Sequence, residues 1–171
     1  MHAMRTHWKS VTAVICCATI FAGCWKEHDV ISIKSDGQTT FTSDVEITDK
    51  SFSLADIDST TSEMVRELQA AGWRVQRRWV SKAPPYKLTF SGEGNIRQVK
   101  SASDLYQIKK LNDRTYSIRF IPDESEDGKS SRSIEFKHGF FGGGPRILDQ
   151  RGNEVHQIAN ATKDQTYRIV F

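Results

Sequence analysis

The sequence predicts an α+β fold, in which an antiparallel, curved β-meander of about eight to ten short strands packs on one α-helix, Thr60–Ala71. The main observation is period-two alternation of apolar and polar residues, as expected for strands with one buried face. The clearest examples are Tyr86/Leu88/Phe90, Tyr116/Ile118/Phe120 and Tyr167/Ile169/Phe171. Turn signals separate these segments, and only one segment has a helical stripe. A single striped helix indicates packing on a sheet.

The helix is predicted from its stripe and from both of its ends. Met64, Val65, Leu68 and Ala71 recur at helical spacing, so they share one face. Thr60 followed by Glu63 has the spacing of a capping box, which places the start at Thr60. Gly72 is suited to the position just after the end, where a left-handed backbone stops a helix.

The strands are predicted in chain order from alternating runs of residues. VISIK and TFTSDVEI flank Asp36-Gly37, a hairpin signal. The later runs are WRVQRRWV, YKLTFS, NIRQVK, LYQIKK, TYSIRFI, RSIEFKH, RILD, EVHQI and TYRIVF. Turns are expected at Gly92-Glu93-Gly94-Asn95, Asn112-Asp113, Asp127-Gly128 and Arg151-Gly152-Asn153.

Length and charge favour one globular domain without a nucleic-acid partner. A chain of 171 residues can bury a core of its own. The formal net charge is +3, and Arg5 and Lys9 supply two of these charges from a segment without acids. The remainder is nearly neutral, so we expect no nucleic-acid binding. Cysteine occurs only at positions 16, 17 and 24, which excludes a disulfide or a cysteine-rich zinc site in the body.

The N-terminal segment has the pattern of a secretory signal. Arg5 and Lys9 precede an apolar run from Val11 to Gly23. Thirteen helical residues span about 20 Å, which is short of the roughly 30 Å hydrocarbon core of a bilayer. The run is therefore predicted to be a signal peptide and not a membrane span.

The end of this segment, Phe21-Ala22-Gly23-Cys24, resembles the lipobox of bacterial lipoproteins. The resemblance implies diacylglycerol addition to the Cys24 thiol, cleavage after Gly23 and acylation of the new amino terminus. It divides the chain into a signal peptide (1–23), a lipidated cysteine with a short tether (24–29) and one β-rich domain (30–171). Such an anchor would hold the protein on a membrane almost permanently. No other cofactor is expected.

The residue after the cysteine indicates the membrane. By analogy with the enterobacterial sorting rule, aspartate after the lipidated cysteine retains a lipoprotein in the inner membrane. Trp25 stands at that position, so the outer membrane, on its periplasmic face, is expected. The tether from Trp25 to Asp29 reaches at most about 18 Å, which would keep the domain close to the lipid surface.

An uneven distribution of charge suggests a candidate binding surface. Residues 26–67 contain 4 basic and 10 acidic side chains, whereas residues 74–119 contain 11 basic and 3 acidic ones. Within the basic block, the candidate binding residues are Trp73, Arg77, Arg78 and Trp79. Exposed together, they would suit anionic headgroups or an acidic protein. Alternatively, the tryptophans belong to the core and the arginines pair with the acidic first third.

Other motifs do not assemble into a catalytic site. Asp123, Ser125 and Asp127 match the start of a calcium loop, but position twelve of that loop is Ile134 and no helices flank it. The His138–Pro145 stretch resembles an esterase oxyanion loop, yet the chain has no Gly-x-Ser-x-Gly nucleophile elbow. Glu154 and His156 would share a face of a strand, and two residues do not make a site. An enzyme is therefore not expected.

Three functions remain open from the sequence. The first is a non-enzymatic, periplasm-facing lipoprotein that binds a protein partner, as an immunity protein or an envelope-assembly accessory. The second is a lipid or lipoprotein carrier, whose curved sheet would enclose an apolar cavity and which resembles the lipoprotein receptor of the localisation pathway at fold level only. The third is a hydrolase of the cell wall or of lipids, for which no acid, base and nucleophile can be named.

Overall fold

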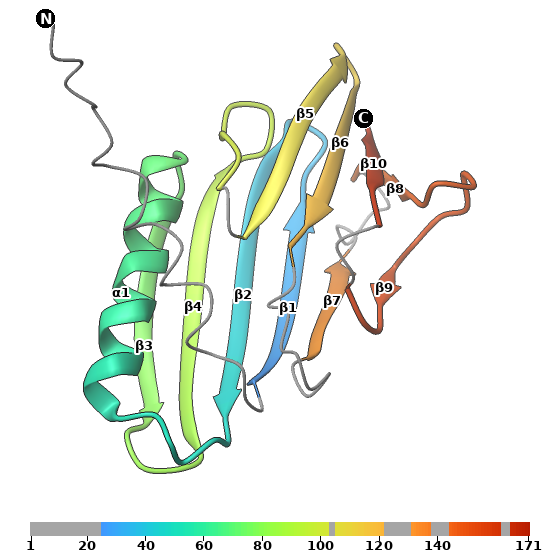
Figure 1. Ribbon diagram of the computed structural model, residues 1–171. Helices are drawn as coiled ribbons and strands as arrows, with labels where there is room; N and C mark the ends of the chain where they lie inside the picture. The colour runs from blue at the N-terminus through green and yellow to red at the C-terminus, as the bar shows by residue number, and fades with distance from the viewer. Residues whose placement is uncertain (1–24, 103–104, 122–130, 138–143, 162–164) are drawn as a thin grey trace, which may run out of the picture.

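The protein is mostly β, with ten strands and one helix in the part that the structure describes. This structure is a computed structural model, and it describes residues 25–102, 105–121, 131–137, 144–161 and 165–171. The expected α+β class with one helix is confirmed at this level (Figure 1). Within the described ranges, no helix has the length and apolar character needed to cross a membrane.

Six strands form the larger sheet, which is curved. In spatial order they are β3 (Arg74–Ser81), β4 (Tyr86–Asn95), β2 (Gln38–Ile47), β1 (Trp25–Ile33), β7 (Ser131–Lys137) and β9 (Gln157–Ile158). Neighbouring strands are antiparallel, except that β1 and β7 run parallel with Glu27 opposite Arg132. The expected antiparallel meander is therefore wrong at the β1–β7 pair. Pairing between segments about 100 residues apart is a long-range choice that local alternation does not encode.

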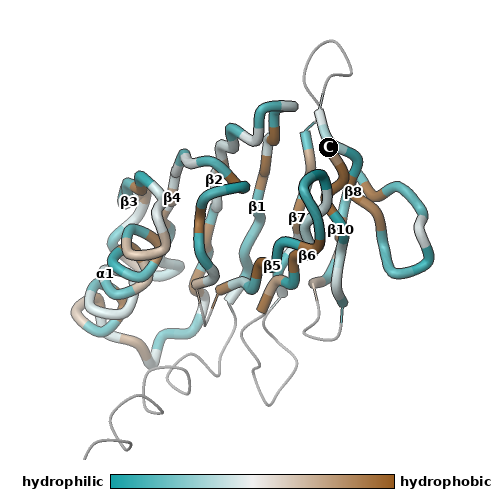
Figure 2. The backbone as a smooth tube through the Cα atoms, turned by 90° about the horizontal axis from the view of Figure 1, so that it is seen from above, coloured by the Kyte–Doolittle hydropathy of each residue, from teal (hydrophilic) through white to brown (hydrophobic). Residues whose placement is uncertain are grey.

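A second, four-stranded sheet stands beside the first. Its order is β5 (Tyr106–Asn112), β6 (Thr115–Phe120), β10 (Tyr167–Val170) and β8 (Arg146–Leu148), and all its pairs are antiparallel. Seen from above, the helix and the β5–β6 hairpin lie on the same side of the six-stranded sheet (Figure 2). In this arrangement the inward face of the larger sheet packs against the helix and the second sheet.

The helix α1 spans Leu54–Ala70, so its predicted start at Thr60 is wrong. Ser53 is the N-cap: its side chain accepts from the backbone N–H of Asp56, and the Asp56 carboxylate accepts from the Ser53 backbone N–H. This capping box lies seven residues before the expected one, and the fully buried Ile57 extends the apolar stripe by about two turns. The predicted C-terminal stop is confirmed. Gly72 has φ +103°, and the Trp73 N–H donates to the Leu68 carbonyl as in a Schellman motif.

Several strand boundaries differ from the sequence-based ones. Strand β1 begins at Trp25, so the segment expected to be a tether is the first half of that strand. Of the run NIRQVK, Asn95 ends β4 and the residues after it form a turn and not a strand. Conversely, the Gly92–Asn95 stretch, expected to be a turn, continues β4. The hairpins at Asp36-Gly37 and Asn112-Asp113 are confirmed, whereas the expected turn at Asp127-Gly128 lies outside the described residues.

The core lies between the two sheets and the helix. The period-two residues predicted to face inward are buried on β4, β6 and β10, with Phe171 partly buried beyond the last strand. Fully buried side chains come from every layer, among them Ile47, Ile57, Leu88, Ile134, Ile147 and Ile169. Burial of these apolar groups is the main force that holds the layers together.

Candidate functional site

An apolar pocket lies where the larger sheet, the helix and the second sheet meet. Its volume is about 80 Å³. Strands β1, β2, β4 and β7 form its floor, and α1 contributes Met64 and Leu68. The second sheet contributes side chains from β5, β6 and β10. The lining residues Ile31, Phe41, Met64 and Leu105 remain partly exposed, while most of the others are buried.

One wall of the pocket is aromatic, and two glycines of β4 make room for it. The Phe41 and Trp73 rings meet edge to face with centroids 5.3 Å apart. A Cβ atom at Gly92 would lie 2.3 Å from the Phe41 ring, and one at Gly94 would lie 2.8 Å from the Trp73 ring. Glycine at these two strand positions therefore lets the aromatic rings lie against the sheet.

A hydrogen-bonded chain ties this wall to the second sheet. Trp73 Nε1 donates to the Tyr106 hydroxyl at 2.6 Å, and that hydroxyl donates to the Lys100 carbonyl at 2.5 Å. Burial raises the pKa of Tyr106 to about 12, against the lowering effect of the Trp73 hydrogen bond. The phenol therefore remains neutral at physiological pH and holds the aromatic wall in place.

The opposite end of the pocket carries a buried charge cluster, formed by Glu27, Asp29 and Arg132. Arg132 Nε donates to Asp29 Oδ2 at 2.7 Å and lies 3.6 Å from Glu27 Oε2. Glu27 also accepts from the Ser43 hydroxyl at 2.9 Å. Their side chains are only 13% (Glu27), 4% (Asp29) and 13% (Arg132) exposed. Two carboxylates thus share one guanidinium in a largely apolar interior.

Arg132 also joins the two sheets. Its Nη1 donates to the carbonyls of Leu105 and Ile121, at 3.1 and 3.4 Å, and its guanidinium lies 5.5 Å from the centroid of the Phe120 ring. Burial opposes its charge, but the Asp29 and Glu27 carboxylates outweigh this effect and raise the pKa of Arg132. Arg132 is therefore a permanent cation in the cluster.

Glu27 is a member of the cluster whose charge changes near neutral pH. Burial raises the pKa of Glu27 to about 7, with the Asp29 charge acting in the same direction and Arg132 and Ser43 opposing it. When Glu27 is protonated the cluster is neutral, and when it is ionised the cluster carries one surplus negative charge. The pocket is thus an apolar enclosure that contains the Glu27 carboxyl group, which ionises near neutral pH.

The residues predicted to form a basic-aromatic surface are not exposed together. Trp73 is buried, and Arg77 and Trp79 are half-buried beneath α1. Arg77 pairs with Asp58 at 2.7 Å and donates to the hydroxyl of Thr61, and Trp79 Nε1 donates to Asp58 at 3.3 Å. Only Arg78 is exposed, on the opposite face of β3. These contacts favour the alternative in which the tryptophans pack inward and an arginine pairs with the acidic first third.

The remaining candidate residues from the sequence form no further site among the described residues. Cys24 and the possible calcium ligands Asp123, Ser125 and Asp127 lie outside the described residues. Glu154 and His156 are exposed, and β9 contains only the two residues that follow them, so they do not share a strand face as expected. Among the described residues, no group of three or more histidine, cysteine or carboxylate side chains could hold a metal ion.

The charge cluster was missed because β1 was expected to begin at Val30. Read from Trp25, the strand places Trp25, Glu27, Asp29, Ile31 and Ile33 on one face, which puts two acids among buried residues. Arg132, Ile134 and Phe136 alternate in the same way on β7. The sequence therefore held a signal for the cluster, because two acids and one base lie on otherwise apolar strand faces.

In comparisons with known proteins, no family model, curated protein or solved structure matches this chain.

Proposed function

We propose that this chain is a lipid-anchored, periplasm-facing lipoprotein of the bacterial outer membrane that acts as a non-enzymatic binding module. The lipobox-like Phe21–Cys24 supports the anchor, and Trp25 supports the outer membrane. Strand β1 begins at the residue that follows Cys24. An acylated Cys24 would therefore hold the domain directly against the leaflet, with no tether between them.

The observation that carries the binding role is the pocket with its buried charge cluster. Apolar pockets with a few convergent polar groups and a perturbed pKa are the usual places for ligands. The apolar lining provides affinity for a hydrophobic group, and the cluster provides one polar point of recognition. A protein partner that inserts an apolar side chain fits this arrangement, as does a free small molecule.

The second candidate, a lipid carrier, is favoured by the same cavity but limited by its size. About 80 Å³ is several times the roughly 10–15 Å³ that one water requires, and about half of a 150 Å³ cavity that accepts benzene. This volume suits the end of an apolar chain or a small molecule. Transport of a whole lipid would require the helix and the second sheet to separate.

The anchor is tested by mass spectrometry of membrane fractions from cells that express the wild-type chain, Cys24→Ala or Cys17→Ala. We expect a triacylated N-terminal peptide that starts at Cys24 in the wild type and in Cys17→Ala. Cys24→Ala should lose acylation and cleavage at this site. A wild-type protein with an unmodified Cys24, or one found in the soluble fraction, would contradict the proposal.

The binding role is tested by what the protein carries when it is purified from envelope extract without detergent. A stoichiometric protein partner would support the binding module, and a stoichiometric whole lipid would favour the carrier instead. Recovery of neither, with an empty pocket by NMR after exposure to the extract, would count against both candidates.

A further inference from the structure

The pocket combines aromatic side chains with two acids and one base. Its lining includes the aromatic side chains Phe41, Trp73, Phe90, Tyr106, Phe120 and Phe136. The polar end holds two acids, Glu27 and Asp29, against one base, Arg132. Aromatic rings and a carboxylate together form the environment that attracts organic cations.

The excess of acids over bases in the cluster favours a cationic ligand head group over an anionic one. Arg132 is already engaged by Asp29 at 2.7 Å and by two backbone carbonyls. A ligand carboxylate would therefore meet two acids beside a guanidinium whose Nε and Nη1 are already engaged, which makes its desolvation expensive. A ligand cation would meet the ionised Glu27 and bring the net charge of the cluster to zero.

We propose that this pocket binds a small organic amine, with its ammonium group at Glu27 and its apolar body along the aromatic wall. The Arg132–Asp29 pair stays intact, and Arg132 positions Glu27 from the parallel neighbouring strand β7. The half-buried Ile31, Phe41, Met64 and Leu105 would line the path of a tail longer than the cavity. This inference rests on the proposed binding function and assigns its ligand class.

Binding of the amine is linked to release of a proton. Glu27 holds its proton up to a pH of about 7, because burial raises its pKa. The ammonium group favours the ionised carboxylate, so the amine displaces the proton. Among the lining residues the other titratable groups are Asp29, Arg132 and Tyr106, and α1 contributes only Met64 and Leu68. Arg132 and Tyr106 keep their charge states across neutral pH.

The test is an NMR titration of the mature chain with Cys24→Ala, secreted behind an ordinary cleavable signal peptide in place of residues 1–23, which removes the acylation site and keeps residues 25–171 complete. The probes are n-butylamine, 1-butanol and butyrate, which share a chain and differ in head group. We expect n-butylamine to bind tightest at pH 8, with shifts at the amides of Glu27, Ser43 and Arg132. Its affinity should fall about 30-fold at pH 5.5, since each pH unit below the pKa weakens binding about tenfold.

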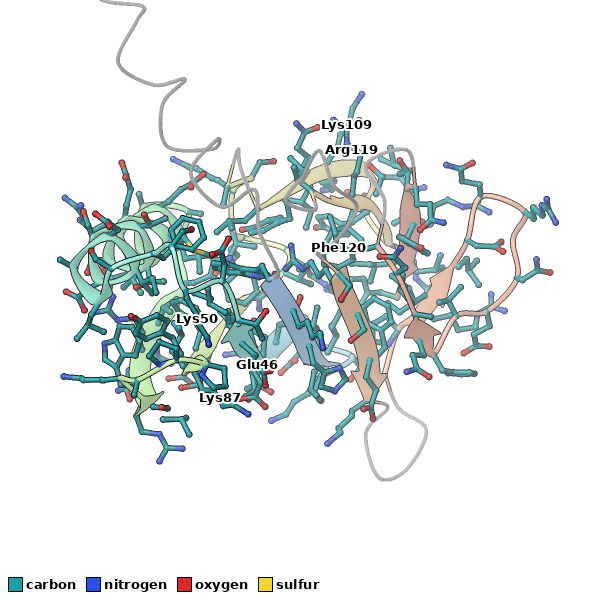
Figure 3. All side chains as sticks on the ribbon, turned by 60° about the horizontal axis from the view of Figure 1, so that its bottom comes forward. Glu46, Lys50, Lys87, Lys109, Arg119 and Phe120 are labelled. Carbon is teal, nitrogen blue, oxygen red and sulfur yellow. The ribbon has the colours of Figure 1, made fainter. Side chains whose placement is uncertain are left out.

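Two variants separate the role of Glu27 from a general effect of charge. Glu27→Gln should remove both the preference for the amine and its pH dependence, while 1-butanol binding persists. Glu46→Gln is the matched control, because Glu46 lies on β2 and pairs with Lys87 at 2.8 Å away from the pocket (Figure 3). It should leave all three affinities unchanged.

The outcomes distinguish this inference from the proposed function. If 1-butanol or butyrate binds as tightly as n-butylamine at pH 8, the pocket binds ligands but the amine assignment is wrong. Amine binding that is unchanged in Glu27→Gln would also overturn it. If no probe shifts any pocket amide, the small-ligand binding role itself is contradicted.

Discussion

Glu27 and Arg132 lie directly opposite each other on two parallel strands, β1 and β7, although 105 residues separate them in the chain. Their side chains meet in the interior, with Glu27 Oε2 and Arg132 Nε 3.6 Å apart, and Asp29 holds the same nitrogen more closely. The pairing of these strands thus creates the charge cluster, and four predictions test how the cluster and its surroundings are built.

The first prediction concerns pH and stability. The pKa of Glu27 is about 7 in the folded protein against an ordinary value of 4.5, so the folded state binds the proton more tightly than the unfolded chain. The stabilisation from this proton is complete below pH 4.5 and is lost as pH rises through 7. The difference between the two pKa values corresponds to about 3 kcal/mol of unfolding free energy. Urea denaturation at pH 5 and pH 8 measures it.

Glu27→Gln provides the control for this pH dependence. The amide can still accept from Ser43 but does not titrate, so the difference in unfolding free energy between pH 5 and pH 8 should shrink by most of that amount. An equal pH dependence in both proteins would assign the effect to other groups.

The second prediction concerns the glycines under the aromatic wall. Gly92→Ala should destabilise the protein by about 1–3 kcal/mol, because the new methyl group would overlap the Phe41 ring. In a Phe41→Leu background the same substitution should be much less destabilising. Equilibrium denaturation of the two single variants and the double variant measures this coupling, and strictly additive losses would contradict the overlap.

The third prediction separates two adjacent arginines. Arg77→Met should cost about 1–2 kcal/mol, because it removes the contacts with Asp58 and Thr61 beneath α1. Arg78→Met should change stability by less than about 0.5 kcal/mol, because Arg78 is exposed on the other face. Thermal and urea unfolding of both variants compares them. Equal losses would mean that β3 does not present alternate faces as described.

The fourth prediction tests where the helix begins. Ser53→Ala should cost about 1 kcal/mol, because it removes the side chain that accepts from the Asp56 N–H. Thr60→Ala should change stability by less than about 0.5 kcal/mol, since position 60 lies inside the helix. The reverse order of losses in urea denaturation would place the start of the helix at Thr60.

The sequence alone determined the local features. The stop at Gly72, the hairpins at Asp36-Gly37 and Asn112-Asp113, and the inward faces of β4, β6 and β10 follow from interactions between residues close in the chain. These features depend on backbone conformation and period-two burial, which a short stretch of sequence encodes. The lipobox at Phe21–Cys24 is local in the same sense, and the anchor it implies remains a prediction.

Only the tertiary structure decided how distant strands meet. The parallel pairing of β1 with β7 depends on the whole chain, and it placed Glu27 beside Arg132. The tertiary structure also decided that Gly92 and Gly94 continue a strand beneath aromatic rings, although their local sequence is typical of a turn. Charged residues in a strand acquire a role through their neighbours on other strands, because burial and pairing set their energies. Local alternation could mark Glu27, Asp29 and Arg132 as charges on apolar strand faces, but only the strand pairing brought them together in one pocket.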